Sequence, residues 1–96
     1  MTQRPRILLV DDEVAIQRTV GPLLRSRGYE VDIAGSGAEA LEIFAERTPG
    51  LIVLDLGLPD LEGTEVCRRV RATSQVPIIV LSARGAEADK VNALDL

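Results

Sequence analysis

Three short apolar runs, at residues 7–10, 51–54 and 78–81, are each followed directly by side chains that carry oxygen. In chain order, these side chains are Asp11, Asp12, Asp55 and Ser82. Binding sites of open α/β sheets form beyond the carboxyl ends of the strands. If the three runs are neighbouring parallel strands, three carboxylates and a hydroxyl therefore converge on one edge of the sheet.

Carboxylates brought together in this way indicate a cation site with phosphoryl chemistry. Like charges repel one another and need a counter-charge. Mg²⁺ supplies one, because it prefers oxygen ligands, takes one or two carboxylates and keeps several waters. Charge neutralisation is also the main catalytic need when a carboxylate attacks phosphorus and forms an acyl phosphate. The pattern predicts magnesium-assisted phosphoryl transfer.

Taken one at a time, the same residues have plainer interpretations. Asp11 or Asp12 can cap a following helix. An aspartate after a strand, such as Asp55, is more often a turn former, and a lone Ser82 is more often a cap or turn hydroxyl. The combination favours a site, because all these oxygens stand at strand ends of one predicted sheet edge.

The elements that must position these residues alternate between strands and helices. The apolar runs predict strands buried on both faces, as in parallel sheets, and the alternating run at 29–33 predicts an edge strand. Helical spacing predicts helices over 13–27, from Ser36, over 64–71, and from Ala86 through the last residue, Leu96. This order predicts an α/β fold, a doubly wound parallel sheet with helices on both faces.

Local signals mark where the helices begin and end. Ser36 followed by Glu39 forms a capping box, and Gly28 stands where a helix stop belongs. Gly21-Pro22 lies inside the first predicted helix, and Pro22 removes one backbone hydrogen bond there. We therefore expect a kink or break at that point.

Composition limits the classes of protein to consider. The chain has 96 residues, enough for one domain, and a formal charge of -4. That charge argues against DNA binding by this segment through phosphate neutralisation. Cys67 is the only cysteine, which fits a reducing cytosol and a core position. No apolar run approaches the ~20 residues of a membrane span.

Three segments, residues 7–13, 54–60 with Gly63, and 76–83, strongly resemble the receiver domains of two-component response regulators. They read ILLVDDE, LDLGLPD and VPIIVLSA. The second and third are nearest to receivers of winged-helix transcription regulators. The resemblance implies a flavodoxin-like fold with strand order 2-1-3-4-5. It also implies a cytoplasmic signalling switch that is phosphorylated by a partner histidine kinase and assists its own phosphorylation and dephosphorylation without being an enzyme.

The resemblance also implies a role for each site residue. Asp55 matches the phosphoacceptor, and Asp12 matches the direct carboxylate ligand of Mg²⁺. Asp11 is expected to act on the metal mostly through water, and Gly57 to offer its backbone carbonyl. Ser82 matches the hydroxyl that reorients to hydrogen-bond the phosphoryl group.

The family continues beyond the features found here. The resemblance implies a fifth strand with an aromatic switch residue, a lysine after that strand and a fifth helix, none of which lies within residues 1–96. The chain is therefore expected to be an incomplete receiver that is phosphorylated poorly. The strand at 78–81 is expected to be an open edge. The chain is therefore expected to associate with itself, either by pairing at this edge or by exchange of the terminal helix between two copies.

Three alternatives compete with a phosphorylated receiver. Gly35-Ser36-Gly37-Ala38-Glu39-Ala40 fits the G-x-G-x-x-A pattern of dinucleotide-binding domains. A phosphatase with an aspartyl nucleophile generally has a second aspartate two residues later, where this chain has Gly57. A protein-interaction module on a receiver scaffold would never be phosphorylated, and the missing lysine keeps this alternative open.

Overall fold

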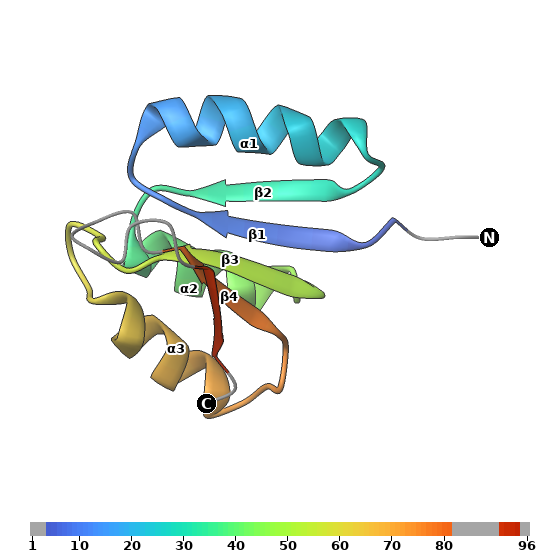
Figure 1. Ribbon diagram of the computed structural model, residues 1–96. Helices are drawn as coiled ribbons and strands as arrows, with labels where there is room; N and C mark the ends of the chain where they lie inside the picture. Colours follow the sequence, from blue (N-terminus) through green and yellow to red (C-terminus); the bar gives the residue numbers. More distant parts are fainter. Residues whose placement is uncertain (1–3, 82–90, 95–96) are drawn as a thin grey trace.

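A computed structural model describes residues 4–81 and 91–94 of the chain, and these form a sheet with helices on both faces (Figure 1). The sheet has the strand order β2-β1-β3-β4-β5. Its strands are β1 (Arg6–Val10), β2 (Glu30–Ala34), β3 (Leu51–Asp55), β4 (Ile78–Leu81) and β5 (Val91–Leu94). The first four are parallel, which confirms the predicted order 2-1-3-4.

The helices lie on opposite sides of this sheet. In Figure 1, α1 lies on one side, while α2 and α3 lie together on the other. Their bounds are α1 (Val14–Ser26), α2 (Gly37–Glu46) and α3 (Gly63–Arg71). Right-handed crossovers between parallel strands produce this two-sided arrangement. It leaves the carboxyl ends of β1 and β3 side by side, and the β1–α1 and β3–α3 connections continue from these ends.

The core forms between the central strands and the helices. The apolar runs of β1, β3 and β4 supply most of its fully buried side chains, among them Leu8, Val10 and Leu54. The predicted inward face of α3 is confirmed, because Val66, Cys67 and Val70 are all buried. Leu8, Val10 and Leu54 belong with Val66, Cys67 and Val70 to one cluster. Burial of these side chains ties the central strands, and hence the residues at their ends, into a fixed framework.

Of the two predictions made for the first helix, one on its end and one on its interior, the structure confirms the first. Gly28 takes a φ of 96° just after α1, so the predicted helix stop is confirmed. Of the predicted kink or break at Gly21-Pro22, the break does not occur, because α1 continues through both residues. The kink stays a prediction. Gly21 is buried against Ile33 of β2, where an added Cβ would lie 3.1 Å from Ile33 Cδ1. This close packing holds the helix on the sheet in spite of the backbone hydrogen bond that Pro22 cannot make.

The predicted helix from Ala86 to Leu96 is wrong where the structure describes it. Val91–Leu94 form β5, which pairs with β4 in antiparallel register, with Val91 opposite Leu81 and Leu94 opposite Ile78. Residues 82–90 and 95–96 lie outside the described part of the chain. A strand at this position pairs the backbone groups along the outer side of β4, which would otherwise be open. Therefore β4 is not the sheet edge that we expected.

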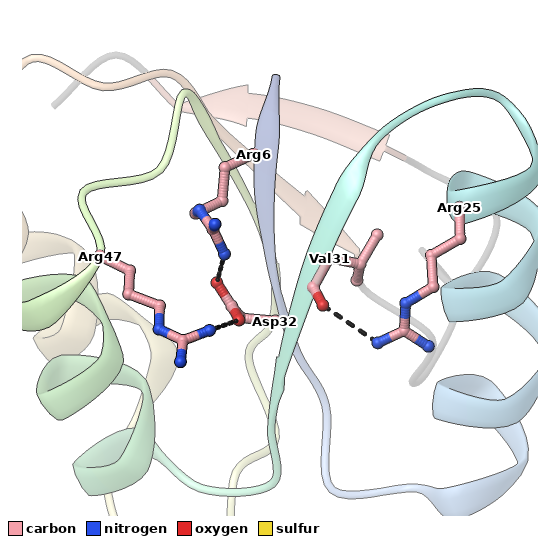
Figure 2. Close-up of polar contacts among 5 residues, drawn as sticks. All are labelled: Arg6, Arg25, Val31, Asp32 and Arg47. Carbon is pink, nitrogen blue, oxygen red and sulfur yellow. Dashed lines mark hydrogen bonds and ion pairs between the residues drawn. The ribbon is translucent and has the colours of Figure 1, made fainter. Parts of the chain in front are cut away.

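Charged side chains secure the opposite edge strand, β2. Asp32 accepts hydrogen bonds from Arg6 Nη1 at 2.7 Å and from Arg47 Nη1 at 3.0 Å, and so links β1, β2 and the end of α2 (Figure 2). On the other side of β2, Arg25 Nη2 donates to the Val31 carbonyl at 3.0 Å. A guanidinium thus occupies part of the edge that a further strand would use.

Among the described residues, none of the helices has the length and apolar character needed to cross a membrane.

Candidate functional site

Three aspartates meet at the carboxyl ends of β1 and β3. Asp11 and Asp12 directly follow β1, and Asp55 is the last residue of β3. These strands are paired neighbours, with Val10 opposite Leu54. One carboxylate oxygen from each aspartate lies within 4.8 Å of those of the other two. The structure therefore brings together the three predicted carboxylates.

Asp11 is fixed by both its backbone and its side chain. Its N–H donates to the Ala34 carbonyl at 3.0 Å, and its own carbonyl accepts from Gln17 Nε2 at 2.7 Å. Its carboxylate accepts from the Glu13 N–H at 2.8 Å. The N-cap of α1 is Glu13, whose side chain makes no capping hydrogen bond within the described part of the chain. The plainer interpretation of Asp11 or Asp12 as the helix N-cap is therefore wrong, although Asp11 satisfies one N–H at the start of the helix.

The electrostatics of this cluster call for a cation. Asp11 and Asp55 are both only 5% exposed. Burial raises the pKa of Asp11, and the negative charges of Asp55, Glu13 and Asp12 raise it further against the lowering effect of the Glu13 N–H. Within the described residues, the buried oxygens Asp12 Oδ1 and Asp55 Oδ2 have no hydrogen-bond partner. Buried polar atoms normally have one, so a hard cation that takes oxygen ligands fits this donor set.

The loop between β3 and α3, residues 56–62, continues directly from Asp55. The Gly63 N–H closes the loop by donating to the Leu56 carbonyl at 3.2 Å. An added Cβ at Gly63 would lie 2.8 Å from Leu56 Cα and 3.2 Å from the Asp55 carbonyl oxygen. Only glycine lets α3 begin this close to the backbone of Asp55. Gly57 lies in this loop, and the predicted role of its carbonyl toward a metal stays a prediction.

Asp60 of the same loop is a functional candidate that the sequence interpretation missed. Its Oδ1 accepts from the Gly37 N–H at 2.8 Å, and its Oδ2 accepts from the Ala38 N–H at 3.0 Å. These hydrogen bonds lower the pKa of Asp60. The contact joins residues 22 and 23 positions apart, so no local pattern reveals it.

The position of Asp60 decides against the dinucleotide-binding alternative. A pyrophosphate in such a domain would take the N–H groups at the start of the helix after the glycine-rich turn. Here the Asp60 carboxylate already accepts the Gly37 and Ala38 N–H groups. The Ser36 half of the predicted capping box is confirmed, because Ser36 Oγ accepts from the Glu39 N–H at 3.1 Å. The Glu39 carboxylate accepts instead from the N–H of Gly35, one residue before the cap, at 2.7 Å. The glycine-rich turn is thus a structural cap.

The remaining predicted site residue, Ser82, lies outside the described residues. Leu81, the last residue of β4, pairs with Asp55 in the parallel ladder. The strand that precedes Ser82 therefore ends beside the phosphoacceptor candidate, as predicted. The role of the Ser82 hydroxyl stays a prediction.

Comparison with known proteins agrees with the fold. Residues 7–96 match the response regulator receiver domain family. Transcriptional regulatory protein KdpE of Mycobacterium tuberculosis is 47% identical over 89 residues, which cover 93% of this chain and 39% of that protein. The chain belongs to the response regulator receiver domain family of two-component systems, and its curated relatives are transcriptional regulators.

Solved structures show the same fold. Chemotaxis response regulator CheY4 of Vibrio cholerae superposes with a TM-score of 0.82 and 32% identity, covering 92% of this chain and 76% of that one. Response regulator TrrA of Thermotoga maritima, solved in complex with Mg²⁺ and BeF, gives a TM-score of 0.79 and 37% identity. The match to TrrA covers 86% of this chain and 73% of that one.

The chain is much shorter than the curated relatives that it matches. It spans 39% of the length of KdpE and of the probable transcriptional regulator ycf27 of Cyanophora paradoxa. What the family comparison establishes for this chain is a receiver domain.

Proposed function

We propose that Asp55 accepts a phosphoryl group from a phosphohistidine of a partner sensor kinase, in a magnesium-dependent reaction, and that the domain thereby acts as a signalling switch. The observation that carries this proposal is the cluster of Asp11, Asp12 and Asp55, with two buried carboxylate oxygens that lack partners within the described residues. Membership of the receiver family supports it.

The transfer exchanges one bond to phosphorus for another. A carboxylate oxygen of Asp55 bonds to phosphorus while the bond between phosphorus and the histidine nitrogen breaks. The imidazole leaves with the electrons of that bond and takes up a proton, and the product is an acyl phosphate on Asp55. Asp55 is held for this attack by its place in the sheet, where it pairs with Leu81 of β4. A nucleophile on a strand is positioned more exactly than one on a loop.

Asp11 and Asp12 are the neighbours of the nucleophile that hold the cation. Asp12 would supply a direct carboxylate ligand, Asp11 would act through water, and the Gly57 carbonyl would complete the protein's share together with Asp55. Mg²⁺, when bound, neutralises the charge that gathers on the phosphoryl oxygens and the attacking carboxylate. The Glu13 N–H and the backbone hydrogen bonds of Asp11 keep the Asp11 carboxylate oriented toward the cluster. Ser82 would hydrogen-bond the phosphoryl group after transfer.

The partners follow from this role. A sensor histidine kinase is the donor, and transcription is the output that the curated relatives favour. DNA contact would come from a separate output domain, since this segment has a formal charge of -4. The proposal also includes that the chain associates with itself and that the protein is cytoplasmic.

Incubation with MgCl₂ and acetyl phosphate tests the central claim. The parent chain should gain the mass of one phosphoryl group slowly, in line with the poor phosphorylation expected of residues 1–96, and peptide mapping should place it on Asp55. Asp55→Asn should reduce incorporation to background, because an amide is a far poorer nucleophile than a carboxylate. Phosphate mapped to another residue would contradict the proposal.

Magnesium binding provides the control and separates the competing alternative. Asp12→Ala should abolish Mg²⁺ binding, as followed by amide chemical shifts. A parent chain that binds Mg²⁺ but takes up no phosphate from either acetyl phosphate or a phosphorylated kinase would instead favour the unphosphorylated interaction module.

A further inference from the structure

Asp60 forms a bridge between the loop that follows the proposed phosphoacceptor and the start of α2. Its two carboxylate oxygens accept separately, Oδ1 from the Gly37 N–H at 2.8 Å and Oδ2 from the Ala38 N–H at 3.0 Å. Oδ1 also accepts from the Leu61 N–H at 2.8 Å. The first N–H groups of a helix have no partner within the helix and carry a partial positive charge. A carboxylate from another element therefore binds well at this point.

Close packing between Gly37 and Leu61 restrains the loop at the same place as the Asp60 hydrogen bonds. An added Cβ at Gly37 would lie 2.8 Å from Leu61 Cβ and 3.0 Å from Leu61 Cδ1. The residue after Asp60 thus packs directly on the helix start whose N–H groups Asp60 accepts. Leu61 is also packed against the core cluster. Hydrogen bonds and packing restrain the loop at the same two adjacent residues, Asp60 and Leu61.

The opposite end of the loop is tied to the proposed phosphoacceptor. Leu56 directly follows Asp55, and its carbonyl accepts the Gly63 N–H at 3.2 Å. The six-residue span from Gly57 to Glu62 is therefore held at its ends by this bond and near its middle by Asp60. Gly57, the residue with the proposed carbonyl ligand, lies between the two restraints. Its position relative to Asp55 depends on both of them.

We propose that Asp60 is a positioning residue for the proposed cation site, which it serves by anchoring the β3–α3 loop to α2 and so holding the Gly57 backbone in place for Mg²⁺. This inference rests on the proposed function of the aspartate cluster. A loop that is already ordered loses less conformational entropy when a ligand binds. Loss of the anchor therefore weakens Mg²⁺ binding although Asp60 does not touch the ion.

The test compares two substitutions at the start of the same helix. Asp60→Ala removes the bridge between the loop and α2. Ser36→Ala removes the local cap, in which Ser36 Oγ accepts the Glu39 N–H at 3.1 Å, and leaves the loop untouched. Mg²⁺ titrations followed by amide chemical shifts give the affinity of each variant, and amide hydrogen exchange at residues 37–39 shows that each substitution opens the helix start.

We expect Asp60→Ala to bind Mg²⁺ about tenfold more weakly than the parent, the size of effect that loss of an outer-shell partner produces. Ser36→Ala should stay within about twofold, because it loses a cap without loosening the loop. Asp60→Asn, which keeps an oxygen acceptor but not the charge, should fall between the parent and Asp60→Ala. It also tests the proposal if the alanine variant does not fold.

The outcomes distinguish this inference from the proposed function. Parent-like Mg²⁺ affinity in Asp60→Ala, or equal weakening by Ser36→Ala, overturns the positioning role while leaving the aspartate site intact. A parent chain without Mg²⁺ binding, or an Asp12→Ala variant that still binds like the parent, overturns the proposed site and this inference with it.

Discussion

At the scale of single residues, Asp11 and Asp55 are carboxylates held inside the protein next to one another. Both are 5% exposed, and one oxygen from each lies within 4.8 Å of the other. Burial and like charge each disfavour the ionised form of Asp11. The chain therefore holds its charge in an unfavourable arrangement that a bound cation relieves. Functional sites commonly lower the stability of a protein in this way.

The raised pKa of Asp11 leads to a stability prediction. Because its pKa is raised in the folded state by burial and then by the charge of Asp55, protonation of Asp11 stabilises the fold. That contribution is complete below the unfolded pKa and is lost as the pH rises through the folded pKa. At pH 7 without Mg²⁺, Asp11→Asn should therefore raise the free energy of unfolding by about 1 kcal/mol, a typical single-site effect.

Urea denaturation in the presence of EDTA measures this difference. Asparagine keeps an oxygen to accept the Glu13 N–H, so the substitution mainly removes charge. The gain should shrink as the pH falls toward about 4, because the parent aspartate then takes up a proton itself. Added Mg²⁺ should stabilise the parent more than the variant. A variant less stable than the parent at pH 7 would contradict the prediction.

At the scale of elements, the start of α3 packs on the backbone of the proposed phosphoacceptor. An added Cβ at Gly63 would lie 2.6 Å from Leu56 Cδ2 and 2.8 Å from Leu56 Cα. The side-chain atom can move by rotation, whereas the Cα atom can move only with the strand end. The spacing between β3 and α3 is therefore set by a residue without a side chain, and the geometry of the site depends on it.

Gly63→Ala should destabilise the protein by about 1–3 kcal/mol, the usual cost of overpacking. Helix propensity alone favours alanine over glycine, so a loss of stability shows that the steric contact dominates. Thermal unfolding measures the effect. Gly50→Ala is the control, because the added Cβ would lie 3.7 Å from the Arg6 carbonyl oxygen, an ordinary contact. Equal effects of the two substitutions would rule out the contact with Leu56 as the cause.

At the scale of the whole molecule, the two outer strands of the sheet differ in their protection. The edge strand β2 carries Glu30 and Asp32, and Arg25 donates to its Val31 carbonyl at 3.0 Å. The other edge is β5, whose sequence, VNAL, has no charged residue. Natural sheets usually protect their edges with charge, proline or a covering element, because open backbone groups pair with other chains. Association of the chain with itself is therefore expected at β5 and no longer at β4.

Sedimentation of the 96-residue chain at micromolar concentration tests this expectation. The parent should show a dimer or larger species that dissociates on dilution. Asn92→Lys should shift the equilibrium toward monomer, because a charge on an edge strand opposes pairing with a second copy. A parent chain that is monomeric throughout this range would show that the β5 edge does not recruit a partner.

The sequence by itself determined the parallel arrangement of the first four strands, the inward face of α3 and the meeting of three aspartates. The signals are local, namely apolar or alternating runs, helical spacing and the residue that ends a strand, whereas the strand order 2-1-3-4 came from the family resemblance. The topology rules for βαβ units then place successive strand ends on one edge. Asp11, Asp12 and Asp55 could be named together because each stands at such an end.

Tertiary structure decided what no local signal could. No role was assigned to Asp60 from the sequence, because its carboxylate contacts N–H groups 22 and 23 positions away. Gly37 looked like part of a nucleotide-binding turn until its N–H proved to be taken by that carboxylate. Val91–Leu94 looked like part of a helix, but they pair with β4. Periodicity shows which side of an element is apolar. Whether a short segment forms a strand or a helix depends also on the neighbouring strand that it can pair with, and that neighbour is in place only once the sheet is assembled.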